Sequence, residues 1–289
     1  MKKKLLLTMG CSMTQGVGCY DTSTFDIDEV KGWENFKLNF NKPKTYKNFK
    51  DVLLINKKNE KRFLEYSWGS ILQEKLKYDS FINMGIGGSS TSGQVKLFYE
   101  KLSYLKSLEE YDVLLVWLLP VPYRFSFYTK GTNADVMPGS HAWHEKTNYS
   151  KIDDAYIKFI EDLWYDSFLE QKFYKDIIKL SAEHLGFKFL YTSVVDQVNN
   201  PCISLFNSMF EDDCNLSLLN KEPLCPSEDK NPELFSVLMC HHPNEKGYKL
   251  IGEGIFERIK LYDSSLLNNI TPDSYFKEWN GAYESKNFI

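Results

Sequence analysis

Short apolar runs that end abruptly at glycine or proline constrain the fold of this 289-residue chain more than any other feature. Four short apolar runs stand at residues 4–9, 81–84, 113–119 and 187–195, and the first three of them end at glycine or proline. Gly10 ends the first run, Gly85 the second and Pro120 the third. Runs of this length without polar alternation are typical of strands that are buried on both faces, as in a parallel sheet.

Segments with a helical spacing of apolar residues lie between and after these runs. They begin near Tyr66, after Ser89–Ser92, at Asp153 and at Pro243-Asn244. Serine hydroxyls can cap the start of the second segment, and Gly186 can end the third. Strands that alternate with helices predict a parallel sheet with helices on both faces. We therefore expect a three-layer α/β/α domain around a mostly parallel, five-stranded sheet.

Two stretches interrupt this alternation. Residues 20–64 carry scattered aromatic side chains without a sustained period, and residues 196–240 are irregular with three prolines. We interpret both stretches as insertions in one domain that spans residues 1–262. A polar and aromatic tail, 263–289, follows this domain, and we expect residues 123–152 to form a long polar loop.

The composition argues against two classes of partner. Lys and Arg number 35 against 39 Asp and Glu, which leaves a formal net charge of −4. Without a basic field to hold phosphodiester groups, we expect no nucleic-acid partner. The longest apolar run, 113–122, is far shorter than the roughly 20 residues that span a bilayer, so we expect no membrane partner either.

The N-terminus and the cysteines indicate the compartment. Lys2–Lys4 followed by Leu5–Leu7 imitates a signal peptide, but its apolar part is shorter than the about 7–15 residues that such a peptide needs. The six cysteines include no Cys-x-x-Cys pair, and a chain of this length needs no disulfide. We therefore expect no signal peptide and a reducing, cytoplasmic location, with a disulfide among the late cysteines left open.

Three loops carry the residues of chemical interest, because the carboxyl ends of parallel strands gather reactive groups at one edge of a sheet. Gly10-Cys11-Ser12 follows the first run, and a serine just past a strand end can expose its hydroxyl as a nucleophile. Asn83–Gly88 follows the second run, and its glycines let backbone N–H groups approach a reacting oxygen. His241-His242-Pro243-Asn244 opens the last helix and offers a general base.

Together these three motifs resemble those of the SGNH (GDSL-type) serine hydrolases, in outline over residues 4–262. The resemblance implies a flavodoxin-like α/β/α fold. It also implies that Ser12 is the nucleophile, that His242 is the general base, and that the N–H groups of Ser12 and Gly88 form an oxyanion hole, with Asn83 supporting the Gly88 block. The Gly-Cys-Ser variant is similar to a branch associated with tailed bacteriophages and other large DNA viruses.

The chain departs from the pattern of this family around the nucleophile and after the third run. Cys11 stands where the family usually has Asp. No Asn follows the run at 113–119 as a further oxyanion donor, although Arg124 could partly replace it as an electrophilic group. Loss of one oxyanion donor typically lowers turnover by about 10²–10³.

A further departure concerns the acid of the triad. Met239 stands where the family has Asp, three residues before the histidine. The acid would then be Asp196 or Asp229, or the site would be a Ser–His dyad. His241 competes with His242 for the role of base, and the Pro-Asn that follows favours His242.

The resemblance implies ester hydrolysis through an acyl-serine intermediate, without a cofactor. Small acyl esters, including O-acetyl groups on carbohydrate, are the substrates that it implies. His141 and His144 could bind a metal, but only Glu145 accompanies them, so we expect no metal site.

The departures from the family pattern motivate an alternative function. In this alternative the chain keeps the scaffold with a decayed site and is a structural or binding protein, for example of a virion. Its partners would then be virion proteins or further copies of the chain, and its location would be the virion. Acyl transfer instead of hydrolysis is a third option that the residues do not separate.

Overall fold

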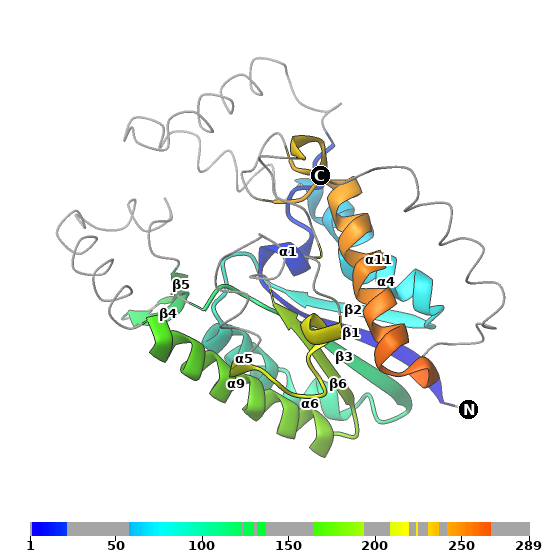
Figure 1. Cartoon of the computed structure of the whole chain (residues 1–289). Helices are drawn as coiled ribbons and strands as arrows, with labels where there is room; N and C mark the ends of the chain where they lie inside the picture. Colours follow the sequence, from blue (N-terminus) through cyan, green and yellow to red (C-terminus); the bar gives the residue numbers. More distant parts are fainter. Residues whose placement is uncertain are drawn as a thin grey trace, which may run out of the picture.

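A computed structural model describes residues 2–21, 58–122, 124–129, 132–136, 164–193, 209–219, 224, 231–236 and 242–266. Its centre is a four-stranded sheet in the order β2-β1-β3-β6, with every neighbouring pair parallel (Figure 1). The strands are β1 (Lys3–Gly10), β2 (Ser80–Gly85), β3 (Tyr111–Leu119) and β6 (Lys188–Ser193). The α/β class and the parallel sheet predicted from the apolar runs are therefore confirmed.

The prediction of a fifth strand is wrong, because the described part of the sheet has four strands. At the outer edge of β6, where a fifth strand would add, a single parallel bridge joins Tyr191 and Asn215. The chain then enters the 3₁₀ helix η4 (Leu216–Leu219), which ends the pairing after one residue. Within the described residues, the pairing at the edge of β6 therefore does not extend into a strand.

Helices cover both faces of the sheet, as Figure 1 shows. They are α4 (Trp68–Leu76), α5 (Thr91–Glu100), α6 (Leu102–Lys106), α9 (Trp164–His184) and α11 (Glu245–Tyr262). Helices α4 and α11 pack against the face that carries Leu6. Helices α5, α6 and α9 pack against the opposite face, which carries Leu5 and Leu7. Because successive side chains of a strand point to opposite faces, one apolar run supplies both cores.

The helix boundaries follow the expected capping residues. Ser90 caps α5 and accepts a hydrogen bond from the Gly93 N–H at 3.1 Å. Gly186 follows α9 with a left-handed φ of +74°, a conformation that favours glycine. The predicted helix from 153 onward is described from Trp164, and its earlier residues lie outside the described ranges.

The prediction that residues 123–152 form a long polar loop is partly wrong. Within it, β4 (Phe125–Thr129) and β5 (Thr132–Val136) form a two-stranded antiparallel sheet. The signal was present in the sequence, because Lys130-Gly131 stands between two short runs rich in aromatic and β-branched residues. The remaining residues of this stretch, 137–152, lie outside the described ranges.

The two predicted insertions and the tail are described only in part. Residues 58–65 are helical, and the rings of Tyr20 and Phe63 meet edge to face at 5.1 Å. The segment after 196 contributes η4 and η5 (Pro232–Leu234). At the start of the tail, η6 (Ser264–Leu266) buries Leu266 in the core beneath α11. The domain boundaries themselves remain predictions.

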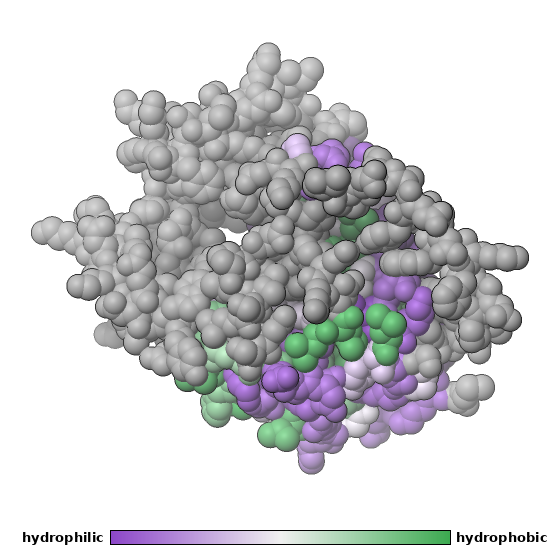
Figure 2. All heavy atoms as spheres, viewed as in Figure 1, coloured by the Kyte–Doolittle hydropathy of each residue, from purple (hydrophilic) through white to green (hydrophobic). Residues whose placement is uncertain are grey.

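The described surface carries small clusters of exposed apolar side chains. On the face in Figure 2, hydrophilic residues cover much of the described surface and apolar residues are exposed in groups between them. On α9 the exposed large apolar side chains are Leu169, Phe173 and Leu180, at spacings that share one side of a helix. Within the described ranges, no helix has both the length and the hydropathy to cross a bilayer.

Candidate active site

Ser12 lies at a sharp turn where β1 ends. Cys11 is still extended, and Ser12 is the first residue of the short helix α1 (Ser12–Gln15). Gly10 makes the turn possible, because a Cβ there would lie 2.0 Å from Thr14 Oγ1 and 2.8 Å from the Leu118 carbonyl oxygen. The structure thus places the Ser12 side chain at the carboxyl end of the central strand, with 7% of its surface exposed.

His242 lies opposite Ser12, at the start of α11. Its Nε2 is 2.8 Å from Ser12 Oγ, which is hydrogen-bond distance. The main chain holds it there, because Ser236 N–H donates to the His242 carbonyl at 2.8 Å. The structure therefore brings together the two residues predicted as nucleophile and base.

Asn244 anchors this histidine segment. Its Oδ1 accepts hydrogen bonds from Lys246 N–H at 2.9 Å and Gly247 N–H at 3.2 Å, which caps α11. Its Nδ2 donates to the carbonyls of Glu233 and Phe235. The side chain amide thus ties the helix start to the segment before it, and the predicted helix start at Pro243-Asn244 is confirmed.

The loop after α1 also holds the start of α11. Tyr248, fully buried in α11, donates its hydroxyl hydrogen to the Val17 carbonyl at 2.7 Å. A hydrogen bond of this kind in the core fixes the helix relative to the loop. Ser12 and His242 are therefore carried by two segments that contact each other directly.

The glycine turn after β2 packs beside α1. The Ile86 N–H donates to the Gly10 carbonyl at 3.0 Å. Asn83 joins the two loops, because its Nδ2 donates to the Thr14 carbonyl and its Oδ1 accepts from Gly85 N–H, both at 2.8 Å. Asn83 thus ties the glycine turn to the end of α1.

Gly88 lies at the exposed end of this turn. Its φ of +77° favours glycine, and a Cβ there would meet no atom within 4 Å. Among hydrogen bonds between described residues, the N–H groups of Ser12 and Gly88 donate to no acceptor. Both groups are therefore available to a bound oxygen.

Of the other predicted supporting residues, the structure describes only Arg124. Arg124 follows β3, half-buried, and its backbone N–H donates to the Val121 carbonyl at 3.3 Å. Asp196, Asp229 and His241 lie outside the described residues.

A buried chain of polar side chains behind the site is absent from the sequence-based predictions. Trp117 Nε1 donates to Gln94 Oε1, Gln94 Nε2 donates to Ser89 Oγ at 2.9 Å, and Ser89 Oγ donates to the Gly10 carbonyl at 3.4 Å. These hydrogen bonds connect β3, α5 and the end of β1. The signal was Gln94 itself, a polar residue four positions before Phe98 on the apolar face of α5.

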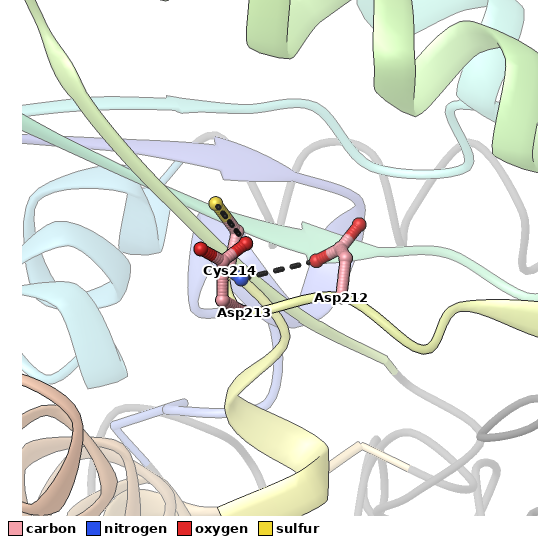
Figure 3. Close-up of side chains that lie close together, drawn as sticks. All are labelled: Asp212, Asp213 and Cys214. Carbon is pink, nitrogen blue, oxygen red and sulfur yellow. Dashed lines mark hydrogen bonds between the residues drawn. The ribbon is translucent and has the colours of Figure 1, made fainter.

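A second cluster of titratable groups lies away from this site. Figure 3 shows Asp212, Asp213 and Cys214, whose potential ligand atoms lie within 4.8 Å of one another. Asp212 already forms an ion pair with Lys175 at 2.6 Å, and burial raises the pKa of the Cys214 thiol, which keeps it protonated. This cluster is therefore an ion-paired group beside β6, and we do not assign a metal to it.

Cys19 lies in the loop after α1, next to the Tyr66 carbonyl. Burial, followed by the charge of Glu245, raises the pKa of its thiol, while Arg62 lowers it. Because a protonated and buried thiol is a poor nucleophile, Cys19 does not compete with Ser12.

Comparison with known proteins gives distant structural likenesses. A scan against models of protein families finds no match, and neither does a search of curated proteins. A lipase from a goat rumen metagenome is 12% identical, with 89% of this chain and 97% of that chain covered and a TM-score of 0.43. A protein from Desulfitobacterium hafniense, assigned to the G-D-S-L family of lipolytic proteins, is 13% identical, with 89% and 99% covered and a TM-score of 0.30. At such identities the function of this chain has to be argued from its own residues.

Proposed function

We propose that this protein is a serine ester hydrolase of the SGNH type that works through an acyl-enzyme. The observation that carries the proposal is the 2.8 Å distance between Ser12 Oγ and His242 Nε2 at the carboxyl end of the parallel sheet. A nucleophile within hydrogen-bond reach of a base is the arrangement that activates a serine. The N–H groups of Ser12 and Gly88, which donate to no acceptor among the described residues, support the same proposal, because an oxyanion needs donors.

In the first half of the reaction, Ser12 Oγ attacks the ester carbonyl carbon and its proton passes to His242 Nε2. The carbonyl oxygen becomes an oxyanion that accepts hydrogen bonds from the N–H groups of Ser12 and Gly88. The C–O bond to the alcohol then breaks, and His242 returns the proton to the leaving oxygen. The acyl group is left on Ser12.

In the second half, His242 takes a proton from water, and the hydroxide oxygen attacks the acyl carbon. Collapse of this second tetrahedral intermediate breaks the bond to Ser12 Oγ, which regains the proton from His242. The products are a carboxylic acid and the free enzyme. No redox group or co-reactant besides water enters this balance.

The acid that orients His242 is proposed from the sequence, as Asp196 or Asp229. An orienting carboxylate is worth about 10⁴ in turnover in serine hydrolases, so a Ser–His dyad would be slow. We propose small acyl esters, including O-acetyl groups on carbohydrate, as the substrate class, on the strength of the motif resemblance.

The test is intact-mass labelling with a fluorophosphonate, combined with hydrolysis of p-nitrophenyl acetate. Wild type is compared with Ser12→Ala, His242→Ala and the control Ser107→Ala, which changes an exposed serine on the opposite side of the fold from α11. We expect one adduct and ester turnover in wild type and in the control, and neither in the two site variants.

A folded wild type that gives no adduct and no turnover would overturn the proposal. The scaffold with a decayed site, serving as a structural or binding protein, would then be the better reading. An adduct that persists in Ser12→Ala would place the reactive group elsewhere.

A further inference from the structure

The side chain of Gln15 lies on the same side of α1 as Ser12. The two residues are the last and first of this helix, and residues three apart share a helix face. Gln15 is half-buried, whereas the other three residues of α1 are buried. Its amide is therefore at the surface of the site and within reach of solvent.

Gly87 fixes the orientation of this amide. The Gly87 N–H donates to Gln15 Oε1 at 2.9 Å. Because a backbone N–H can only donate, the amide oxygen has to face Gly87, and this determines which way the amide is turned. The Nε2 group is therefore the part of the amide that does not contact the Gly87 N–H.

The same contact places the amide beside the nucleophile. A Cβ on Gly87 would lie 2.9 Å from Gln15 Oε1 and 3.9 Å from Ser12 Cβ. The glycine turn, the Gln15 amide and the Ser12 side chain thus occupy one small region. Within the described residues, the Gln15 Nε2 donates to no acceptor, so both of its hydrogens are available.

The other amide of this region is already occupied. Asn83 uses Nδ2 on the Thr14 carbonyl and Oδ1 on the Gly85 N–H. After β3, Pro120 and Pro122 stand where the SGNH pattern has an asparagine. Gln15 therefore offers the donor that the segment after β3 does not.

We propose that Gln15 is a catalytic residue of this hydrolase and that its Nε2–H donates a third hydrogen bond to the oxyanion formed when Ser12 attacks the ester. This inference rests on the proposed function. The hydrogen bond from Gly87 to Oε1 polarises the amide and strengthens Nε2 as a donor. Three donors then face the oxyanion, from Ser12, Gly88 and Gln15.

The decisive variants are Gln15→Glu and Gln15→Leu. Glutamate has nearly the same shape and still accepts from Gly87 N–H, but its carboxylate cannot donate. Leucine loses both the acceptor and the donor without adding charge. We expect kcat for p-nitrophenyl acetate to fall about 100-fold or more in both variants, with little change in KM, as for the loss of one oxyanion donor.

The pH profile separates donation from positioning. A neutral carboxylic acid can donate a hydrogen bond, so the ratio of Gln15→Glu to wild-type kcat should rise as pH falls through the carboxyl titration. The ratio for Gln15→Leu should stay flat. Taking ratios to wild type cancels the titration of the shared histidine.

The results distinguish a failure of the Gln15 inference from a failure of the proposed function. If Gln15→Glu keeps wild-type kcat, Gln15 only positions Gly87 and the inference is overturned. If Gln15→Leu keeps wild-type kcat, the amide is dispensable and the inference is likewise overturned. A wild type without esterase activity or fluorophosphonate adduct overturns the proposed function instead, whereas an active wild type isolates the failure to Gln15. Circular dichroism and thermal unfolding confirm that each variant is folded.

Discussion

Gly18 lies directly against Pro243, so that a Cβ on Gly18 would be 2.2 Å from the Pro243 carbonyl oxygen. The same Cβ would be 3.2 Å from His242 Cβ, and Gly18 has a φ of +121°, which side chains rarely adopt. Gly18, three residues after the end of α1, thus sets how closely the histidine segment can approach.

Replacement of Gly18 by alanine should displace His242 from Ser12. The clash cannot be relieved by a side-chain rotation, because the contacted atom belongs to the backbone. We expect fluorophosphonate labelling to slow by about 100-fold or more, since a displacement near 1 Å has that effect on a catalytic pair. The backbone strain itself costs about 1–3 kcal/mol.

The matched control for this variant is Gly186→Ala. Gly186 also has positive φ, +74°, but a Cβ there would meet nothing within 4 Å. The Gly186→Ala variant should unfold at a lower temperature than wild type but keep the wild-type rate of fluorophosphonate labelling. Equal labelling of Gly18→Ala and wild type would contradict the role given to this contact.

Tyr248→Phe should destabilise the fold and loosen the site. The change removes the hydroxyl that donates to the buried Val17 carbonyl at 2.7 Å and leaves that carbonyl unsatisfied. We expect a loss of about 1–3 kcal/mol in the free energy of unfolding, measured by urea denaturation. Tyr99→Phe removes a hydroxyl from a side chain that is 44% exposed and should change little. A Tyr248→Phe variant no less stable than Tyr99→Phe would count against the anchoring role.

Lys175→Met should be destabilising. The Lys175 side chain is 2% exposed, and its Nζ lies 2.5 Å from Asp176 and 2.6 Å from Asp212. Removing Lys175 leaves both carboxylates without this cation, but Asp176 and Asp212 are 43% and 25% exposed and water screens them, so we expect a loss of about 1–3 kcal/mol. Lys172→Met removes a 43% exposed partner of Asp176 and should cost no more than about 1 kcal/mol. Urea denaturation of both variants measures the difference, and equal losses would show that burial of Lys175 is not what matters.

The same cluster should make stability depend on pH. Burial raises the pKa of Asp176, but the hydrogen bonds and charges of Lys175 and Lys172 outweigh it and lower the pKa below its ordinary value. A lowered folded pKa means that the stabilising contribution is present above the unfolded pKa and is lost as pH falls through the folded pKa. Asp176→Asn should therefore destabilise the protein at about pH 7, and this effect should shrink as the pH falls through the lowered folded pKa of Asp176.

The Lys175→Met background provides the control for this pH effect. With the main cation removed, Asp176→Asn should show a smaller change in unfolding free energy and a weaker dependence on pH. A pH-independent effect of Asp176→Asn in the wild-type background would refute the ion-pair explanation.

Much of the fold could be predicted because it depends on local patterns. The runs at 4–9, 81–84, 113–119 and 187–195 became the four parallel strands, since a strand buried on both faces has to be apolar throughout. The hairpin of β4 and β5 was missed because its strands are short and lie in a stretch of polar character. The fifth strand was wrong because Asn215 pairs for one residue before η4 begins.

What the sequence by itself determined is the chemistry of each loop: a serine at a strand end, a glycine turn and a histidine before a capped helix. Only the tertiary structure decided that Ser12 and His242, which are 230 positions apart, meet at 2.8 Å. It also decided that Gly18 makes room for the histidine segment and that Gln15 turns its amide oxygen toward the Gly87 N–H. The reason is physical, because local propensity acts over a few residues, whereas distances between loops follow from how β1, β2 and α11 pack around one core.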